Sequence, residues 1–544
     1  MNFNKKILFL MILLFSVPPI KAMCFNTCFD CCDCNCTCGN HCLYGKTFYC
    51  PRSQNTNIVR QVVGHHLMRH LFDTDKFNLD LTITPQYGQS FKPYHMAEYF
   101  FATDCIHFSG SKIPPNIPGT TTTRPCYHFL ADYFGLSPTF SGKVRVKPEV
   151  KTFLVDFNLY LGLDNIREGL FFEVNAPIVR TRWNMCICEE TCNCRPAYED
   201  FPAYYMDDPI VKPPTTSIKQ ALMGGLTWGD AQNGMKFGKI GCCNTMTKLA
   251  DVNFKLGYLF INRENGYVGL SLLATAPTGN SSQSCCLFEP ITGNCHHWEL
   301  GVGFLGQKLL WAKDGDQTLH LQVDANFTHL FNSNQRRSFD FIKNGYYSRY
   351  TLLKVFDGNQ NYTGELLPAI NATTLCCKVK MAFQADMNIM LAYNNKNWEV
   401  DFGYNGWIRS REEICLIDCL PKDKYGMKGI QNVGGGAQNI TQSCATIYGD
   451  KLSDQATVAD KTYPQFINTC DLCIDSASTP KLLTHKFYWH VSRAWGDKEE
   501  RERIPYVGVG WQIEFESINP RYMLPDKNAM YNWALWVKFG CAYG

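Results

Sequence analysis

Carboxylate side chains recur at alternate positions of several apolar segments, and they are the groups of this chain best suited to binding a cation. Asp386 lies in one such segment, and Glu399 and Asp401 lie in the next one, after a short link at 394–397. If the two segments pair as a hairpin, the three carboxylates face one another. Like charges held together are stabilised by a bound cation or by a shared proton. We therefore expect a cation-binding group at this hairpin.

The same alternation predicts which ionisable side chains line the inside of a pore. They are Asp156, Glu173, Lys255, Glu299, His320, Asp324, Lys380, Asp386, Glu399, Asp401, Arg409, Glu514 and Lys538. Eight of them are acids, four are bases and one is a histidine. Rings of carboxylates favour cations, so this excess predicts a weak cation preference. Mixed charges in a narrow barrel also pair and seal it, and the sequence leaves open whether the lumen is conducting or closed.

Cysteine is the second reactive residue type, with 28 copies in the chain. Nine of them are crowded between Cys24 and Cys50. The candidates for disulfides in external loops are Cys186, Cys188, Cys192, Cys194, Cys242, Cys243, Cys285, Cys286, Cys295, Cys376, Cys377, Cys415, Cys419, Cys444, Cys470 and Cys473. Thiols of an exported chain are typical of a disulfide framework, whose pairing does not follow from sequence.

Metal binding is the alternative for the two densest cysteine clusters, at 31–38 and 186–194. Adjacent and alternate cysteines share a Zn²⁺ or Cu(I) ion more easily than they bridge each other. We favour disulfides and predict neither a metal nor a cofactor. The N-terminal cluster from Cys24 to Cys50 holds more thiols than a short peptide pairs within itself. We therefore expect it to link the chain to a second copy or to another envelope protein.

Motifs for enzymatic chemistry are missing from the sequence. There is no Gly-x-Ser-x-Gly, no His-Glu-x-x-His and no phosphate-binding loop with its lysine. His296 and His297 end a loop and are expected at the surface rather than as ligands. The formal net charge of +3 falls to about zero once a leader with Lys5, Lys6 and Lys21 is removed. We therefore predict that the protein is not an enzyme and does not bind nucleic acid.

Twelve segments with period-two alternation must position these side chains. They are 77–84, 152–162, 169–178, 249–261, 267–276, 298–306, 318–330, 379–393, 398–409, 485–494, 506–516 and 530–543. A strand has two faces, so each segment presents one apolar and one polar side. Tilted strands of 9 to 11 residues cross a bilayer, and most of these segments are at least that long.

The links between the segments alternate between short and long, as in bacterial outer-membrane barrels. The fold class is therefore all-β, a transmembrane antiparallel up-and-down barrel of about 12 strands (12–16) with long disulfide-rich external loops. The range allows for extra strands at 221–228 and 348–356. The long external loops are predicted at 85–150, 180–248, 277–297, 331–378, 410–484 and 517–529.

The N-terminus predicts export. Lys5 and Lys6 precede an apolar run at 7–17, and a cleavage site follows at Ala22, as in a secretory signal peptide. The predicted organisation is a signal peptide at 1–22, a cysteine-rich periplasmic segment at 23–76 and an outer-membrane barrel at 77–544. The expected location is the bacterial outer membrane, whose lipids are the barrel's partners.

The segments around 249–258, 270–279 and 298–304 resemble the hairpins of porin-like outer-membrane channels, including those proposed to admit aromatic or fatty compounds. The cysteine content is similar to that of the disulfide-linked major outer-membrane porins of chlamydia-like intracellular bacteria. These resemblances imply a porin-like channel for small solutes that also cross-links the envelope.

Two other functions stay open. One is a structural or adhesive envelope protein that uses the barrel as an anchor. The other is a secreted cysteine-rich glycoprotein, because Asn280, Asn326, Asn361, Asn371 and Asn439 each begin an Asn-x-Ser/Thr sequon.

Overall fold

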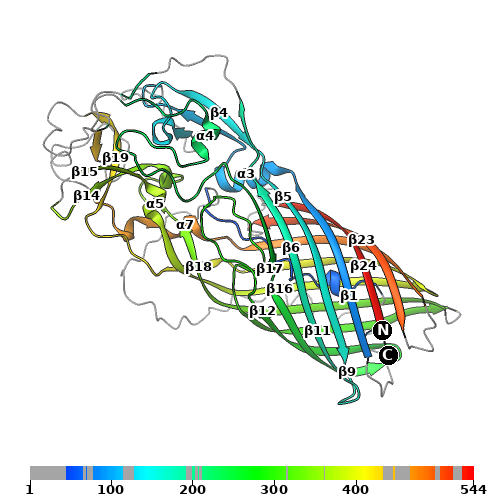
Figure 1. Ribbon diagram of the computed structural model, residues 1–544. Coiled ribbons are helices and arrows are strands. Elements are labelled where there is room, and N and C mark those ends of the chain that lie inside the picture. The colour runs from blue at the N-terminus through cyan, green and yellow to red at the C-terminus, as the bar shows by residue number, and fades with distance from the viewer. Residues whose placement is uncertain are drawn as a thin grey trace, which may run out of the picture. The chain divides into compact units, whose positions relative to one another are not determined.

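Twelve antiparallel strands form a closed barrel in the computed structural model (Figure 1). The strands are β1 (Asn78–Phe91), β5 (Glu149–Gly162), β6 (Leu170–Asn184), β9 (Val252–Arg263), β10 (Gly266–Ala276), β11 (Glu299–Lys313), β12 (Gln317–Ser338), β16 (Thr374–Asn395), β17 (Trp398–Arg409), β22 (Leu482–Ala494), β23 (Ile504–Ile518) and β24 (Tyr531–Tyr543). The first and last strands pair from Leu79 with Tyr543 to Phe91 with Tyr531. Pairing of β12 with β16 completes the ring.

The structure describes residues 45–64, 69, 78–113, 128–190, 199–201, 206, 211–313, 316–359, 362–432, 445–447, 466–495, 503–518 and 530–543. All of them belong to one compact unit, Cys34–Gly544. The predicted signal peptide and the cysteines from Cys24 to Cys42 lie outside the described residues, as do Cys126, Cys192, Cys194 and Cys444.

Alternation along the strands gives the barrel an apolar outer surface. In β10, Leu270 and Leu272 are 55% and 61% exposed, whereas Ser271 between them is 5% exposed. The aromatic residues Trp298 and Trp398 are also exposed. An apolar outer band with aromatic residues suits lipid rather than water. In the described part of the chain no helix is long and apolar enough to cross a membrane.

Each of the twelve predicted segments corresponds to a barrel strand, which confirms the predicted fold class. The structure extends several strands beyond the prediction, and β12 and β16 are each 22 residues long. The predicted segment 249–261 is interrupted after Leu249, so that β8 (Cys243–Leu249) and β9 both pair with β6. The short links β5–β6, β9–β10, β11–β12, β16–β17 and β22–β23 all lie at one end, called here the short-turn end.

The two proposed extra strands do not join the barrel. Residues 348–356 form η3 (Ser348–Tyr350) and β14 (Leu352–Phe356), which belongs to a separate sheet. The prediction for 221–228 is wrong, because α4 (Ile218–Leu222) covers its start. Ser217 caps this helix by accepting a hydrogen bond from Gln220 N, and this local capping favours helix over strand.

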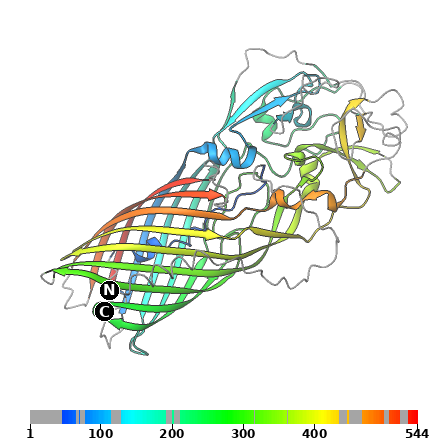
Figure 2. The same ribbon diagram turned by 180° about the vertical axis from the view of Figure 1, so that it is seen from behind.

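The long links fold at the other end of the barrel, the long-loop end (Figures 1 and 2). One sheet contains β2 (Cys105–Ser109), β3 (His128–Leu130), β4 (Ser141–Val146) and β7 (Ile187–Glu190). A second contains β14, β15 (Tyr362–Pro368), β19 (Tyr425–Asn432) and β20 (Ala445–Ile447). The remaining elements are β13 (Asp340–Phe341), β18 (Glu412–Leu416), β21 (Leu472–Cys473), α2 (Ile58–Val62), α3 (Pro93–Phe101), α5 (Ala369–Thr373), α7 (Ile474–Ala477), η2 (Ala131–Phe134) and η5 (Thr469–Asp471). Of these, α2 lies in the barrel.

An aromatic core holds the long-loop end together. Phe100 and Phe101 of α3 are buried in it, with Phe288, Tyr347 and Trp183 from three other links or strand ends. Phe100 packs edge-on against Phe288 with 5.7 Å between ring centroids. Such pairs contribute packing energy beyond buried area. The long loops are therefore packed structure and form a mouth over the barrel.

Candidate functional site: the barrel lumen and the segment inside it

The inner face of the barrel is polar, and the structure places twelve of the thirteen predicted pore residues on it. The inward residues are Asp156, Glu173, Lys255, Glu299, His320, Asp324, Asp386, Glu399, Asp401, Arg409, Glu514 and Lys538, all buried except the partly exposed Lys255. Their neighbours along each strand point outward, as a strand's pleat requires. Whether these residues line a conducting pore stays a prediction.

Lys380 is the exception, because it does not share the inward face of Asp386. In β16 the register slips opposite Thr328, Leu330 and Ser333, and two successive residues, Ala382 and Phe383, are exposed. This bulge inverts the alternation. Lys380 is therefore half-exposed beside β18, where it pairs with Glu413, and its prediction as an inward residue is wrong.

Residues 45–64, called here the luminal segment, run inside the barrel. At the long-loop end Lys46 N donates to Tyr99 O and Thr47 N donates to Ser476 O. The chain then descends to the short helix α2, visible in deep blue between the barrel walls (Figure 2). The predicted boundary of a periplasmic segment at 23–76 is therefore wrong for these residues, which are buried in the lumen.

Arg52 anchors the middle of the luminal segment. Its guanidinium donates to Asp386 at 2.7 Å and to Glu514 at 3.0 Å, and also to Asn405 Oδ1 at 2.8 Å. The side chains of Arg52 and Asp386 are 6% and 3% exposed. Fork-shaped guanidinium contacts to carboxylates are among the stronger hydrogen bonds in proteins, so this contact fixes the segment to strands on opposite sides of the β17–β22 pair.

Two further arginines repeat the pattern deeper in the barrel. Arg60 of α2 donates to Asp156 at 2.8 Å. Arg69 donates to Asp80 at 2.9 Å and contacts Glu173 at 3.4 Å. Arginines near the N-terminus thus partly neutralise the acidic excess of the wall.

Backbone groups of the luminal segment are satisfied by the wall as well. Gly64 N donates to Asp401 Oδ2 at 2.8 Å, and Lys538 Nζ donates to Val63 O at 2.7 Å and to Arg60 O at 3.0 Å. The apolar side of α2 packs against wall residues including Tyr488 and Trp536. Buried backbone groups need hydrogen-bond partners, and the wall supplies them. The wall is therefore complementary to this segment in hydrogen bonding as well as in size.

The expected cluster of Asp386, Glu399 and Asp401 does not form. In the β16–β17 pairing Asp386 lies opposite Trp407, and Asp401 lies opposite Ala392. Six strand positions therefore separate the two aspartates, roughly 20 Å at ~3.3 Å per residue. Asp386 is bound by Arg52, and Asp401 contacts His490 Nδ1 at 3.3 Å. Asp386 thus binds a different partner from Asp401, because the strand pairing places the two aspartates at different depths, whereas Glu399 and Asp401 stay two residues apart on β17.

Small cavities remain beside the luminal segment. One of about 60 Å³ is lined by Asn57, Gln61 and Glu173 among others, and one of about 80 Å³ by Arg52, Lys486 and Gln512 among others. A water needs ~10 to 15 Å³ measured in this way. Each of these two cavities has room for a few waters beside the luminal segment.

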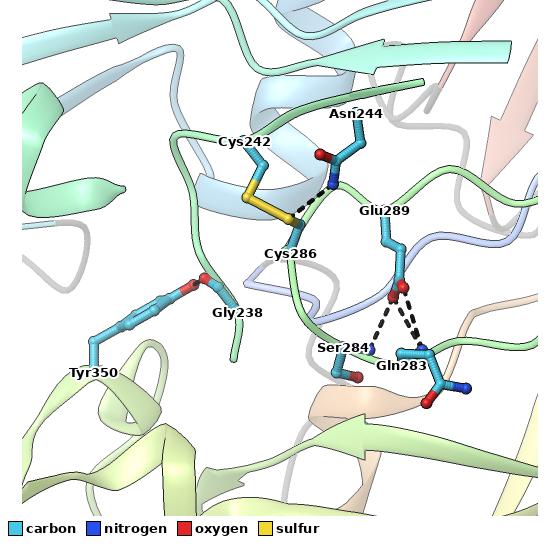
Figure 3. Close-up of a disulfide and its surroundings, with 8 residues drawn as sticks. All are labelled: Gly238, Cys242, Asn244, Gln283, Ser284, Cys286, Glu289 and Tyr350. Atoms are coloured by element: carbon cyan, nitrogen blue, oxygen red, sulfur yellow. Dashed lines mark hydrogen bonds between the residues drawn. A yellow bond between two sulfur atoms is a disulfide. The ribbon is translucent and has the colours of Figure 1, made fainter. Parts of the chain in front are cut away.

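Disulfide chemistry is found at the long-loop end. Cys242 and Cys286 form a disulfide with 6.1 Å between their Cα atoms (Figure 3). Beside it Asn244 Nδ2 donates to Cys286 Sγ at 3.0 Å, and Glu289 accepts from Ser284 N at 2.8 Å. The bond joins the 180–248 and 277–297 links, as predicted for stapled loops.

Other predicted disulfide cysteines have different environments. Cys470 is also disulfide-bonded. Seven of the predicted disulfide cysteines are thiols in this structure, namely Cys186, Cys188, Cys243, Cys285, Cys295, Cys376 and Cys377. Three others, Cys415, Cys419 and Cys473, make further contacts. In the described ranges no group of three or more potential ligands is arranged to hold a metal ion.

A buried polar network closes the mouth above Arg409. Arg337 contacts Glu412 at 3.3 Å, and Gln335 Nε2 lies 3.1 Å from His297 Nε2. His297 Nδ1 contacts Phe331 O at 2.6 Å, and burial lowers the pKa of this imidazole to about 4. The expectation of a surface histidine is therefore wrong for His297, which is fully buried. Its role is structural, because both ring nitrogens are engaged.

Sequence reasoning missed the luminal segment with Arg52 and Arg60, and it also missed Arg69, which follows the segment along the chain. Their signal was present, since eight acids against four bases on a buried face require cations from elsewhere. The prediction assigned that requirement to permeating ions. The stretch with Arg52, Arg60 and Arg69 was interpreted as periplasmic. Their spacing along the chain does not indicate that they bind carboxylates on the inner wall of the barrel.

No protein-family model and no curated protein matches the chain. Solved structures match at low identity. An outer membrane channel of Pseudomonas putida F1 aligns with 87% of this chain and 97% of its own, at 9% identity and a TM-score of 0.33. The toluene transporter TodX of Pseudomonas putida aligns with 87% of this chain and 89% of its own, at 8% identity and a TM-score of 0.30. A FadL homologue of Pseudomonas aeruginosa aligns with 86% of this chain and 90% of its own, at 6% identity and 0.26. The strand pairing, not these likenesses, defines the barrel here, and the likeness to chlamydial porins stays a prediction.

Proposed function

We propose that the protein is an outer-membrane channel of a bacterium that admits small solutes and is closed by its own luminal segment. The supporting observation is the set of ion pairs from Arg52, Arg60 and Arg69 to the wall. An apolar segment would leave wall carboxylates buried without a cation, which is strongly destabilising, so the arginines match the segment to a polar wall. When the segment moves out, the carboxylates that it contacted remain on the wall, so the wall of the open lumen is hydrophilic.

The wall that the segment would expose is rich in carboxylates. Three of these carboxylates lose a cationic partner on the segment if it leaves, namely Asp156, Asp386 and Glu514. An acidic lumen favours cations. The weak cation preference therefore belongs, in this proposal, to the state without the segment in place.

Planar-bilayer recordings test the proposal. The wild-type chain is compared with a chain lacking 45–64 and with a full-length Arg52→Gln, Arg60→Gln variant. Both variants are expected to conduct in steps that the wild type shows rarely. Arg145→Gln is the matched control, because it removes an exposed ion pair with Glu190 at the long-loop end. Folding is verified by the heat-dependent gel mobility of barrels. A folded deletion variant without conductance would refute the channel.

A role as an adhesive or structural anchor is the second candidate. It is favoured by the folded sheets and aromatic core of the long-loop end, which exceed what a simple pore mouth requires. The secreted-glycoprotein alternative does not explain a barrel whose outer face exposes leucines such as Leu270 and Leu272. Absence of conductance from the folded deletion variant, combined with binding of the protein to cells or to other envelope proteins, would favour the anchor.

A further inference from the structure

Two cysteines from distant parts of the chain meet at the top of the lumen. Cys50 of the luminal segment and Cys295 of the β10–β11 link have their Sγ atoms 2.7 Å apart. They are 1% and 0% exposed. A disulfide bond is about 2.05 Å long, so only a small movement separates the pair from covalent contact. This contact also rules out Cys50 as a freely accessible cross-linking thiol.

Neighbouring groups hold the two sulfur atoms in place. Arg409 Nη1 donates to Cys50 Sγ at 3.1 Å and Arg409 Nη2 donates to Cys50 O at 3.2 Å. On the other side, Cys295 O accepts from Ser333 Oγ at 3.1 Å and from Gln335 Nε2 at 3.0 Å. Both cysteines are therefore fixed through their own backbones.

The electrostatics of the pair favour a thiolate on Cys50. The hydrogen bond from Cys295 and the nearby Arg409 guanidinium lower the pKa of the Cys50 thiol to about 7, whereas burial raises the pKa of Cys295. A thiolate is the nucleophile of disulfide exchange. Within the docked pair Cys50 is thus the sulfur that more readily carries the negative charge.

We propose that Cys50 and Cys295 are joined in the oxidised protein by a disulfide that fastens the luminal segment to the mouth of the barrel. The oxidant is a disulfide carrier of the cell envelope. The Cys50 thiolate attacks one carrier sulfur, the carrier S–S bond breaks, and the other carrier sulfur leaves as a thiolate. The Cys295 thiolate then attacks Cys50 Sγ and displaces the carrier. Two electrons and the two thiol protons end on the reduced dithiol carrier.

Burial sets when this exchange happens. A carrier cannot reach sulfurs that are at most 1% exposed, so oxidation occurs while the segment is docking or has transiently left its site. Once closed, the bond is shielded while the segment is docked, so a reductant reaches it only when the segment leaves its site transiently. Arg52 and Arg60 lie beyond Cys50 along the chain, and their ion pairs remain non-covalent. The disulfide thus tethers one end of the segment and leaves the other end releasable.

Mass spectrometry of the full-length protein tests the link directly. Cells are lysed in N-ethylmaleimide to trap free thiols, and the protein is digested without reductant. A peptide pair joining Cys50 to Cys295, lost after dithiothreitol, is expected. Alkylated Cys50, or Cys50 joined to another cysteine, would overturn the proposal. Cys295→Ser should leave Cys50 alkylated after unfolding, whereas Cys541→Ser, which removes an exposed thiol of β24, should retain the linked pair.

A second arm concerns gating and rests on the proposed function. Dithiothreitol should raise the open probability of the wild-type channel several-fold, and the Cys50→Ser, Cys295→Ser variant should be open to that extent without reductant. The link is judged by the peptide pair alone. A mapped disulfide with no effect of reduction on conductance would refute the gating by the segment and leave the disulfide intact.

Discussion

Arg52 Nη2 lies 2.7 Å from Asp386 Oδ1, and this buried contact joins the luminal segment to the wall of the barrel. Glu514 approaches the same guanidinium at 3.0 Å. Two carboxylates and one arginine share a site from which water is largely excluded. Removal of the arginine leaves Asp386 without its cation and leaves Glu514 with Lys486 alone, at 3.7 Å. Breaking a buried pair in this way destabilises such sites by about 3 to 5 kcal/mol. That penalty applies only while the segment is docked.

Arg52→Gln should therefore release the segment more readily than it unfolds the barrel. We expect a higher open probability in bilayer recordings with little change in the heat-dependent gel mobility. Asp386→Asn should have a smaller effect, because Arg52 retains Glu514. Equal open probability in Arg52→Gln, Asp386→Asn and wild type would show that this contact does not hold the channel closed.

The Cys242–Cys286 disulfide should stabilise the long-loop end and not the barrel wall. It closes a loop between residues 44 positions apart, and such bonds typically contribute about 2 to 4 kcal/mol. In the Cys242→Ser, Cys286→Ser variant, limited proteolysis should cleave the long links at lower protease concentration than in wild type. The barrel fragment should persist. Cys541→Ser is the matched control, and equal protease resistance of the two variants would contradict the assignment.

The sequence was sufficient to predict the strands of the barrel wall, and it was insufficient to predict the segment that lies inside the barrel. Alternation in β10, with Leu270 and Leu272 outward and Ser271 inward, is a local property that two-residue periodicity reports directly. The bulge at Ala382 and Phe383 is a single-residue slip, invisible to that periodicity, and it moved Lys380 off the inner face. The position of Arg52 depends on contacts with residues more than 300 positions away, which no local pattern encodes.

His297 should make the mouth of the barrel sensitive to acid. Burial lowers its folded pKa from 6.5 to about 4, and Glu412, Arg337 and Arg409 lie near it. Between these pH values the unfolded chain takes up a proton that the folded chain does not, so stability is lost as the pH falls from about 6.5 to about 4. The loss is on the order of 3 kcal/mol over this window.

The test compares the temperature of heat-modified gel mobility at pH 7 and pH 4.5. His297→Gln should show a smaller decrease on acidification than wild type, because glutamine does not titrate. His329→Gln, an exposed residue of β12, should behave as wild type. An unchanged acid response in His297→Gln would assign the sensitivity to other groups.

Charge selectivity should depend on the inner carboxylates only after the luminal segment is removed. In a chain without 45–64, Asp386→Asn, Glu399→Gln and Asp401→Asn together should shift the reversal potential in a salt gradient toward that of an unselective pore. Folding should be retained, since inner positions avoid the penalty of charge changes against lipid. Glu365→Gln of β15, at the long-loop end, is the control. An unshifted reversal potential in the triple variant would exclude these residues from the selectivity site.

The orientation of the barrel can be read from two exposed turns. Lys422 lies in a turn of the long link 410–484, and Lys396 lies in the β16–β17 turn at the opposite end, with a positive φ of 53° that marks a tight reversal. Outer-membrane barrels place long loops outside and short turns in the periplasm.

An epitope inserted after Lys422 should therefore be labelled by antibody on intact cells, and one after Lys396 should be labelled only after permeabilisation. Because Lys46 N donates to Tyr99 O at the long-loop end, the same experiment decides from which side of the membrane the luminal segment begins. Labelling of Lys396 alone would invert the barrel and place the Cys50–Cys295 pair at the periplasmic mouth.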